Sequence, residues 1–184
     1  MSYKTAILVS LLVAVGVAGS GCSVSNSNST TATAPKSTEP ARDGARVGTP
    51  APDFQLTKMN GSKVGLDDLR GKPAVLIFWT AWCPVCKEEA PHFNSLAAAY
   101  EPRGVNVLGI NIQDSVARTE GGIRDFGIRY TVARDADAGV ARRYHVTGTP
   151  TVIFLDRNGV VEYFGNELPA DYSSRLAALL AKGA

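Results

Sequence analysis

Residues that bind metal ions in structural sites are scarce in this sequence. Its 184 residues include three cysteines and two histidines. A structural zinc site needs four ligands, usually two cysteine pairs or one pair with two histidines at short spacing. Cys83 and Cys86 form one close pair, but the positions of His92 and His145 match no zinc-finger spacing. We therefore expect no bound metal.

The sequence also lacks an excess of charge of one sign. Its 19 Lys and Arg residues against 17 Asp and Glu residues give a net charge of +2 at pH 7. A balance so close to zero gives no support for nucleic acid or an anionic surface as a partner. The length suits one ordinary domain with a tail rather than two domains.

No apolar run has the usual length of a transmembrane helix. The longest run, Ala6–Ala18, has about 13 residues, against the roughly 20 that a helix needs to cross a bilayer. Lys4 precedes this run and the small residues Gly19, Ser20 and Gly21 follow it, which is typical of a secretory signal peptide. We predict that residues 1–21 are a signal peptide. An uncleaved anchor is the alternative, and both interpretations export the rest of the chain.

Cys22 follows the predicted signal peptide directly. The stretch "VAGSGC" resembles the lipobox of bacterial lipoproteins, although Gly19 stands where Leu is usual. Lipid modification of Cys22 would leave an even pair of cysteines for an oxidising compartment. We predict a lipid anchor at Cys22 in the bacterial cell membrane, with the domain on the extracytoplasmic side; a chance cysteine is the alternative. Residues 22–46, rich in Ser, Thr, Asn and Pro, are predicted to be a flexible tether before a domain at 47–184.

Beyond residue 47 the pattern alternates between strands and helices. Continuous apolar runs predict buried strands, and apolar residues spaced three and four apart predict amphipathic helices. "DRNG" between two apolar runs is a hairpin signal. The predicted strands are 74–79, 105–112, 151–155 and 160–164, and the predicted helices include 93–100, 116–126 and 172–180. This order implies a mixed central β-sheet with helices on both faces.

The stretch "TAWCPVCKEE" contains the cysteine pair between a predicted strand and a predicted helix. Besides zinc, the pair could be a structural disulfide, but a loop this short gives the smallest entropic gain. A redox pair has a mechanism, because the N–H groups at a helix N-terminus favour a thiolate at Cys83 over one at Cys86. Pro84 suits the first helical position. We predict a redox disulfide with Cys83 as the attacking, solvent-accessible thiol and Cys86 as the buried resolving thiol.

The segments "FWTAWCPVCKEEAP" and "VTGTPTVIFLDRNGVV" resemble the active site and the cis-proline segment of thioredoxin-like thiol–disulfide oxidoreductases of the TlpA/ResA type. The resemblance covers residues 47–180 and implies an α/β thioredoxin-like fold. It also implies that Pro150 is cis and lies opposite the cysteines, although sequence alone favours trans. A plain turn proline is the alternative. The backbone of Thr149 would then pair with an extended substrate segment.

Trp82 and Pro84 complete the substrate-binding surface that we expect beside Thr149 and Pro150. The alternative for Trp82 is simple packing in the interior. We expect the substrates to be proteins with reactive thiols or disulfides. No cofactor is expected.

The position of thioredoxin's buried carboxylate, six residues before the first cysteine, is occupied here by Ile77. The resemblance places an acidic residue after the next strand, and Asp114 in "GINIQDS" matches that position. Asp114 is therefore the predicted proton acceptor for Cys86. The alternative is that Asp114 only caps the helix beginning near Ser115, since Asp is a good N-cap.

Two other functions are open at this stage. Peroxiredoxins often contain a T-x-x-C motif, which Thr80 and Cys83 satisfy, but Leu76 replaces the proline expected four residues before the threonine. A binding lipoprotein with an inert disulfide is the other alternative. The preferred hypothesis is a monomeric, membrane-anchored reductase with a membrane-embedded electron donor, and the resemblance suggests a role in cytochrome c maturation.

Overall fold

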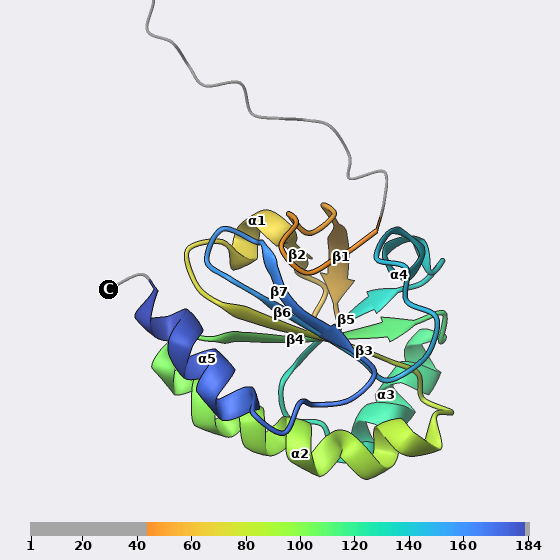
Figure 1. Ribbon diagram of the computed structural model, residues 1–184. Coiled ribbons are helices and arrows are strands. Elements are labelled where there is room, and N and C mark those ends of the chain that lie inside the picture. Colours follow the sequence, from red (N-terminus) through yellow and green to blue (C-terminus); the bar gives the residue numbers. More distant parts are fainter. Residues whose placement is uncertain (1–43, 183–184) are drawn as a thin grey trace, which may run out of the picture. The chain divides into compact units, whose positions relative to one another are not determined.

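The computed structural model describes residues 44–182 (Figure 1). The predicted signal peptide, Cys22 and most of the predicted tether lie outside the described residues. Ala45 is 7% exposed and packs in the hydrophobic core. Among the described residues, no helix combines the length and the apolar character that crossing a bilayer requires.

Seven strands within residues 44–182 form one sheet in the order β2-β1-β5-β4-β3-β6-β7. β3, β4 and β5 are parallel to one another, whereas β1, β2, β6 and β7 pair antiparallel with their neighbours. The mixed sheet is thus confirmed. Its strands are β1 (Gln55–Lys58), β2 (Lys63–Gly65), β3 (Ala74–Trp79), β4 (Asn106–Ile112), β5 (Thr131–Asp135), β6 (Thr151–Leu155) and β7 (Val161–Gly165).

Helices cover both faces of the sheet, as predicted (Figure 1). Alternate residues of β3 point to opposite faces. Val75 and Ile77 belong to the same apolar cluster as the buried residues of α2 and α5, whereas Leu76 and Phe78 pack with α1 and α4. Trp79 packs against Phe126 of α3. The helices are α1 (Leu66–Leu69), α2 (Pro84–Tyr100), α3 (Val116–Phe126), α4 (Gly139–Arg143) and α5 (Tyr172–Ala181), with a 3-10 turn at Glu101–Arg103.

The long elements lie where the sequence predicts them. β3 and β6 have the predicted bounds, and β4 and β7 each begin one residue later than predicted. The sequence analysis did not identify β1, β2, α1, β5 or α4, each of which has three to five residues. Stretches this short contain too few residues to show a clear period.

The strand directions bring three distant segments to one edge of the sheet. β3 and β4 are parallel, with Trp79 beside Asn111, so the turns that follow both strands leave from the same edge. β6 runs antiparallel to β3 and begins with Thr151 beside Phe78, so the segment that precedes β6 reaches this edge too. The cysteine motif, Asp114 and Pro150 therefore meet there.

Candidate active site

The cysteine motif forms the turn between β3 and α2. Cys83 is the N-cap residue of α2, and Pro84 occupies the first position of the helix. Cys83 and Cys86 form a disulfide with a Cα–Cα distance of 5.2 Å. The predicted pairing and the predicted place of Cys83 at the helix start are confirmed.

The two sulfur atoms differ in their hydrogen bonds. The backbone N–H of Cys86 donates to Cys83 Sγ over 3.1 Å, a contact that favours the thiolate form of Cys83 in the reduced protein. The carbonyl oxygen of Thr149 lies 3.3 Å from the same sulfur and would accept a hydrogen bond from a Cys83 thiol. This asymmetry supports Cys83 as the sulfur that carries the charge.

The predicted difference in solvent exposure is wrong for the disulfide form. Cys83 is 4% exposed and Cys86 is 3% exposed, so neither side chain is accessible. The reason is the position of the Thr149–Pro150 segment, whose carbonyl lies against Cys83.

The peptide bond between Thr149 and Pro150 is cis, as the resemblance implied, and Pro150 is buried. The alternative of a plain turn proline is wrong, because the segment lies against the disulfide. Asn166 holds the segment by donating its Nδ2 hydrogens to Pro150 O at 3.2 Å and to Thr151 Oγ1 at 3.0 Å. Sequence reasoning missed Asn166, which follows β7 and bears no local motif.

An exposed apolar surface lies beside the disulfide. Trp82 is 68% exposed and Val85 is 51% exposed, and Pro84 between them in the sequence is exposed as well. The alternative of simple packing for Trp82 is therefore wrong. Exposed aromatic and aliphatic side chains beside a reactive group are suited to contact a protein substrate.

Asp114 lies against the turn that leads to Cys83. It is 4% exposed, and its Oδ2 accepts hydrogen bonds from the backbone N–H of Ala81 at 2.7 Å and from Asn111 Nδ2 at 2.9 Å. The alternative that Asp114 only caps a helix is wrong. Ser115 is the N-cap of α3, and its Oγ accepts from the N–H of Arg118.

Three further polar residues surround Asp114, and the sequence analysis missed all of them. Asn111 donates to the carboxylate, Thr119 Oγ1 donates to Asn111 Oδ1 at 2.7 Å, and Arg134 Nη2 donates to the backbone oxygen of Asp114 at 2.8 Å. One signal was available in the sequence. Asn111 interrupts an otherwise apolar strand pattern, and a buried polar side chain needs partners.

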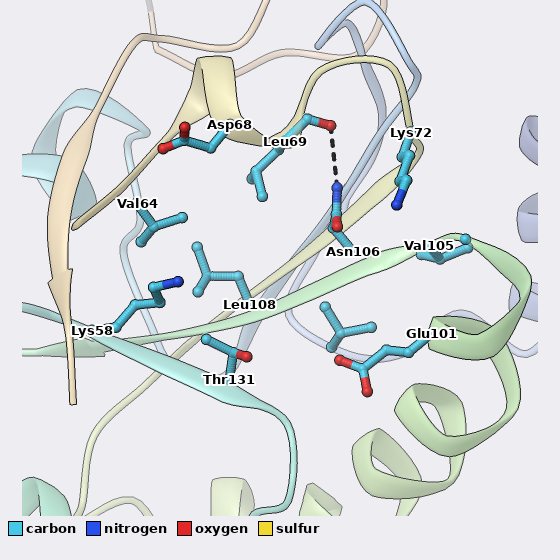
Figure 2. Close-up of a pocket in the computed structure, with 12 residues that line it drawn as sticks. Lys58, Val64, Asp68, Leu69, Lys72, Glu101, Val105, Asn106, Leu108 and Thr131 are labelled. Carbon is cyan, nitrogen blue, oxygen red and sulfur yellow. Dashed lines mark hydrogen bonds between the residues drawn. The ribbon is translucent and has the colours of Figure 1, made fainter. Parts of the chain in front are cut away.

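A hollow that the structure shows among the described residues lies away from the disulfide. A pocket of about 310 Å³ opens near the beginning of β4 and β5, at the end of these strands opposite to the disulfide. Figure 2 shows Lys58, Lys72, Asp68 and Glu101 around it, and burial raises the pKa of Glu101. No cysteine lines this pocket, so the redox chemistry belongs to the opposite end of the strands, where the disulfide lies.

The contacts around the two cysteines support neither a peroxidase site nor a metal site. Thr80 Oγ1 is buried and makes no hydrogen bond among residues 44–182, to Cys83 or to any other residue. Among the same residues, no group of three or more His, Cys, Asp and Glu side chains lies where it could bind a metal ion. The disulfide and the cis-proline segment instead fit thiol–disulfide exchange.

A disulfide at the start of a helix, with the carbonyl of the residue before a cis-proline against its first sulfur, defines a thioredoxin-fold thiol–disulfide oxidoreductase. The chain belongs to the AhpC/TSA family, which it matches over residues 47–164, and within it to the TlpA/ResA type. It is 33% identical to the thiol-disulfide oxidoreductase ResA of Geobacillus kaustophilus over 159 residues, which cover 86% of this chain and 83% of the relative.

Solved structures agree with this assignment. A secreted Mycobacterium tuberculosis disulfide oxidoreductase homologous to E. coli DsbE has a TM-score of 0.57 and 32% identity, with 70% of this chain and 95% of that chain covered. A thiol:disulfide interchange protein from Chlorobium tepidum has a TM-score of 0.62 and 27% identity, with 74% and 98% covered. The predicted thioredoxin-like fold and the oxidoreductase class are confirmed.

Proposed function

We propose that this oxidoreductase reduces disulfides of protein substrates on the extracytoplasmic side of a bacterial cell membrane, to which a lipid on Cys22 anchors it. The observation that carries the exchange chemistry is the Cys83–Cys86 disulfide at the start of α2, against the carbonyl of Thr149. Export and anchoring rest on the sequence pattern of residues 1–22.

The reaction has two steps. In the reduced protein the Cys83 thiolate attacks a substrate disulfide, forms a mixed disulfide and releases one substrate thiolate, which takes up a proton. The Cys86 thiol then loses its proton and attacks Cys83 Sγ. The second substrate thiolate leaves and is protonated, and the Cys83–Cys86 disulfide forms. Two electrons pass from the protein to the substrate, whose two thiols take up the proton released by Cys86 and one proton from solvent.

Asp114 is the proposed acceptor of the proton from Cys86. Ile77 is fully buried, and its aliphatic side chain cannot accept a proton. The Asp114 carboxylate, in contrast, accepts a hydrogen bond from the turn that carries Cys83. A carboxylate within reach of a thiol, directly or through one water molecule, can act as a general base.

The modest stabilisation of a thiolate at Cys83 by its contacts among the described residues supports the reducing direction. One backbone N–H donates to its sulfur, and the carbonyl of Thr149 opposes a negative charge there. A dithiol that is weakly stabilised in its reduced form has a low reduction potential and gives up electrons readily. A reductase needs a donor that reduces its disulfide after each cycle, and we propose a membrane-embedded donor for this role.

The substrate class also follows from the surface beside the disulfide. Trp82, Pro84 and Val85 are exposed, and the backbone of Thr149 can pair with an extended segment of a protein substrate. Apocytochrome c, which the TlpA/ResA resemblance suggests, is the first substrate to test. We expect the protein to act as a monomer.

Equilibration of the chain without residues 1–21 in glutathione buffers tests this function. At a glutathione potential of about −230 mV we expect more than half of the molecules to retain the disulfide. Approach from the oxidised and the reduced side should give the same ratio. Complete reduction would identify an oxidant instead, and failure to equilibrate would identify an inert disulfide. Rapid turnover of hydrogen peroxide would favour a peroxidase.

A further inference from the structure

One row of side chains crosses three strands directly below the turn that carries Asp114. Trp79 of β3, Asn111 of β4 and Arg134 of β5 are neighbours in the register of the sheet. Neighbouring strands lie about 4.8 Å apart, so Asn111 lies between two large side chains. Asn111 is fully buried at 0% exposure.

Two residues of the row, together with Ala81 in the turn after β3, hold Asp114. Asn111 donates to its carboxylate, and Arg134 donates to its backbone oxygen. Ala81, which follows the row by two residues on the β3 side, donates its N–H to the same carboxylate oxygen as Asn111 does. Three neighbouring strands thus determine where this carboxylate lies relative to the cysteine turn.

Thr119 determines which way the amide of Asn111 points. An ionised carboxylate only accepts hydrogen bonds, so the amide must present its NH₂ group to Asp114 and its oxygen to α3. There Oγ1 of the fully buried Thr119 lies 2.7 Å from Asn111 Oδ1 and 3.0 Å from the carbonyl oxygen of Ser115, and we assign its one hydrogen to the shorter contact, with Asn111. Without that donor, the amide oxygen would be buried without a partner.

We propose that Asn111, oriented by Thr119, is a positioning residue that holds Oδ2 of Asp114 so that this carboxylate can take the proton from Cys86 during resolution of the mixed disulfide. The proposal rests on the proposed role of Asp114 as proton acceptor. In this step the proton passes from Cys86 Sγ to the carboxylate, the Cys86–Cys83 bond forms, and the substrate sulfur leaves as a thiolate that is then protonated.

Three variants separate positioning from packing. Asn111→Leu keeps a side chain of similar size but removes the donor to Asp114. Thr119→Val keeps the shape of Thr119 but removes the hydroxyl, whereas Thr119→Ser keeps the hydroxyl. Urea unfolding shows which variants fold, and Thr119→Val tests the proposal even if Asn111→Leu does not fold.

The readout is the glutathione mixed disulfide that forms when the reduced protein meets oxidised glutathione. Acid quenching and mass spectrometry give its rate of formation, which reports attack by Cys83, and its rate of decay, which reports resolution by Cys86. Loss of a hydrogen bond to a charged group corresponds to a change of about tenfold in rate. We expect Asn111→Leu and Thr119→Val to slow decay about tenfold with formation unchanged, and Thr119→Ser to restore decay.

A double-variant comparison separates this proposal from the proposed role of Asp114. In protein that already contains Asp114→Asn, we expect Asn111→Leu to slow decay no further. Slow decay in Asp114→Asn together with normal decay in Asn111→Leu and Thr119→Val would overturn the positioning role alone. Normal decay in Asp114→Asn would overturn the role of Asp114 itself. Equal slowing of formation and decay would show a general structural effect and would also overturn the proposal.

Discussion

The active site contains two sulfur atoms with nearly equal exposure and unequal hydrogen bonding. The N–H of Cys86 donates to Cys83 Sγ, and the carbonyl of Thr149 faces the same atom. Chemical asymmetry in the pair therefore comes from hydrogen bonds and from the helix start rather than from exposure. The two cysteines therefore have different roles, and substituting one or the other should have different effects.

Cys86→Ser is expected to trap mixed disulfides between Cys83 and protein substrates, because the resolving thiol is missing. Gel analysis without reductant should show the adducts, and Cys83→Ser is the matched control that should form none. In the reduced protein, iodoacetamide at neutral pH should modify Cys83 before Cys86. Faster modification of Cys86 would reverse the assignment.

Asp114→Asn is expected to slow exchange and to weaken its dependence on pH between 5 and 9. The amide oxygen of Asn can accept the same two hydrogen bonds, from Ala81 and Asn111, so the geometry is kept while the charge is lost. Neutral hydrogen bonds are weaker than charge-assisted ones, so we expect the free energy of unfolding to fall by about 1 to 2 kcal/mol. An unchanged pH profile of the rate would exclude proton transfer by Asp114.

At the scale of elements, the hairpin of β6 and β7 holds the cis-proline segment. Asn166, just after β7, donates to Pro150 O and to Thr151 Oγ1, and Thr151 Oγ1 donates to Gly148 O at 2.7 Å. These bonds connect the end of one strand to the segment that precedes its partner. The carbonyl that faces Cys83 thus depends on the hairpin.

Asn166→Ala is expected to slow the reduction of a protein disulfide by about tenfold while changing the reaction with glutathione much less. Without Asn166 the segment has fewer contacts to keep it extended for pairing with a substrate, and each lost hydrogen bond costs about 1 kcal/mol. Steady-state rates with both substrates measure the difference. Asn158→Ala, at the exposed turn of the same hairpin, is the matched control. Equal slowing with both substrates would argue against a role in substrate pairing.

At the scale of the whole molecule, the face of the sheet away from the disulfide contains a buried phenol. Tyr144 of the α4 end is fully buried, donates its Oη hydrogen to Pro52 O at 2.7 Å and packs on Phe54 and Phe78. Burial raises the pKa of Tyr144 above its ordinary value of 10.0, and the nearby Asp53 acts in the same direction. The folded protein therefore keeps this phenol neutral where the unfolded chain would ionise it.

The stability that this neutral phenol contributes is fully present below about pH 10 and is lost as pH rises further, because the unfolded state alone then releases a proton. Each such group lowers the free energy of unfolding by about 1.4 kcal/mol per pH unit in that range. Tyr144→Phe should destabilise the protein by about 1 to 2 kcal/mol at pH 7 and should flatten this decline. Urea unfolding between pH 8 and 11 measures both effects. An equal slope in the variant would contradict the prediction.

The anchoring prediction concerns the chain as a whole and falls on residues outside the described range. Cys22→Ala should release the domain into the soluble exported fraction, because the lipid would be absent. Cell fractionation followed by immunoblotting measures the distribution, and Cys83→Ala serves as a control for loss of a cysteine. Tight membrane association of Cys22→Ala would favour an uncleaved N-terminal helix.

From its sequence alone, this chain could be predicted to form the fully buried strands β3 and β6, the helix start at Cys83 and the pairing of two cysteines. These features follow from local order: a continuous apolar run, a proline at the first helical position, and two cysteines three residues apart. Resemblance to the TlpA/ResA type added Pro150 and Asp114. Short elements such as β5 and α4 lacked a readable period and were missed.

Only the tertiary structure decided what surrounds the reactive sulfurs. Asp114 contacts Ala81, 33 residues earlier in the chain, and Thr149 contacts Cys83 across 66 residues. Neither contact has a local signature, because it depends on which strands are neighbours and on their directions. For the same reason, the roles of Asn111, Thr119 and Arg134 could not be predicted from the sequence. Their polar groups find partners only when β3, β4 and β5 lie side by side and α3 packs over them.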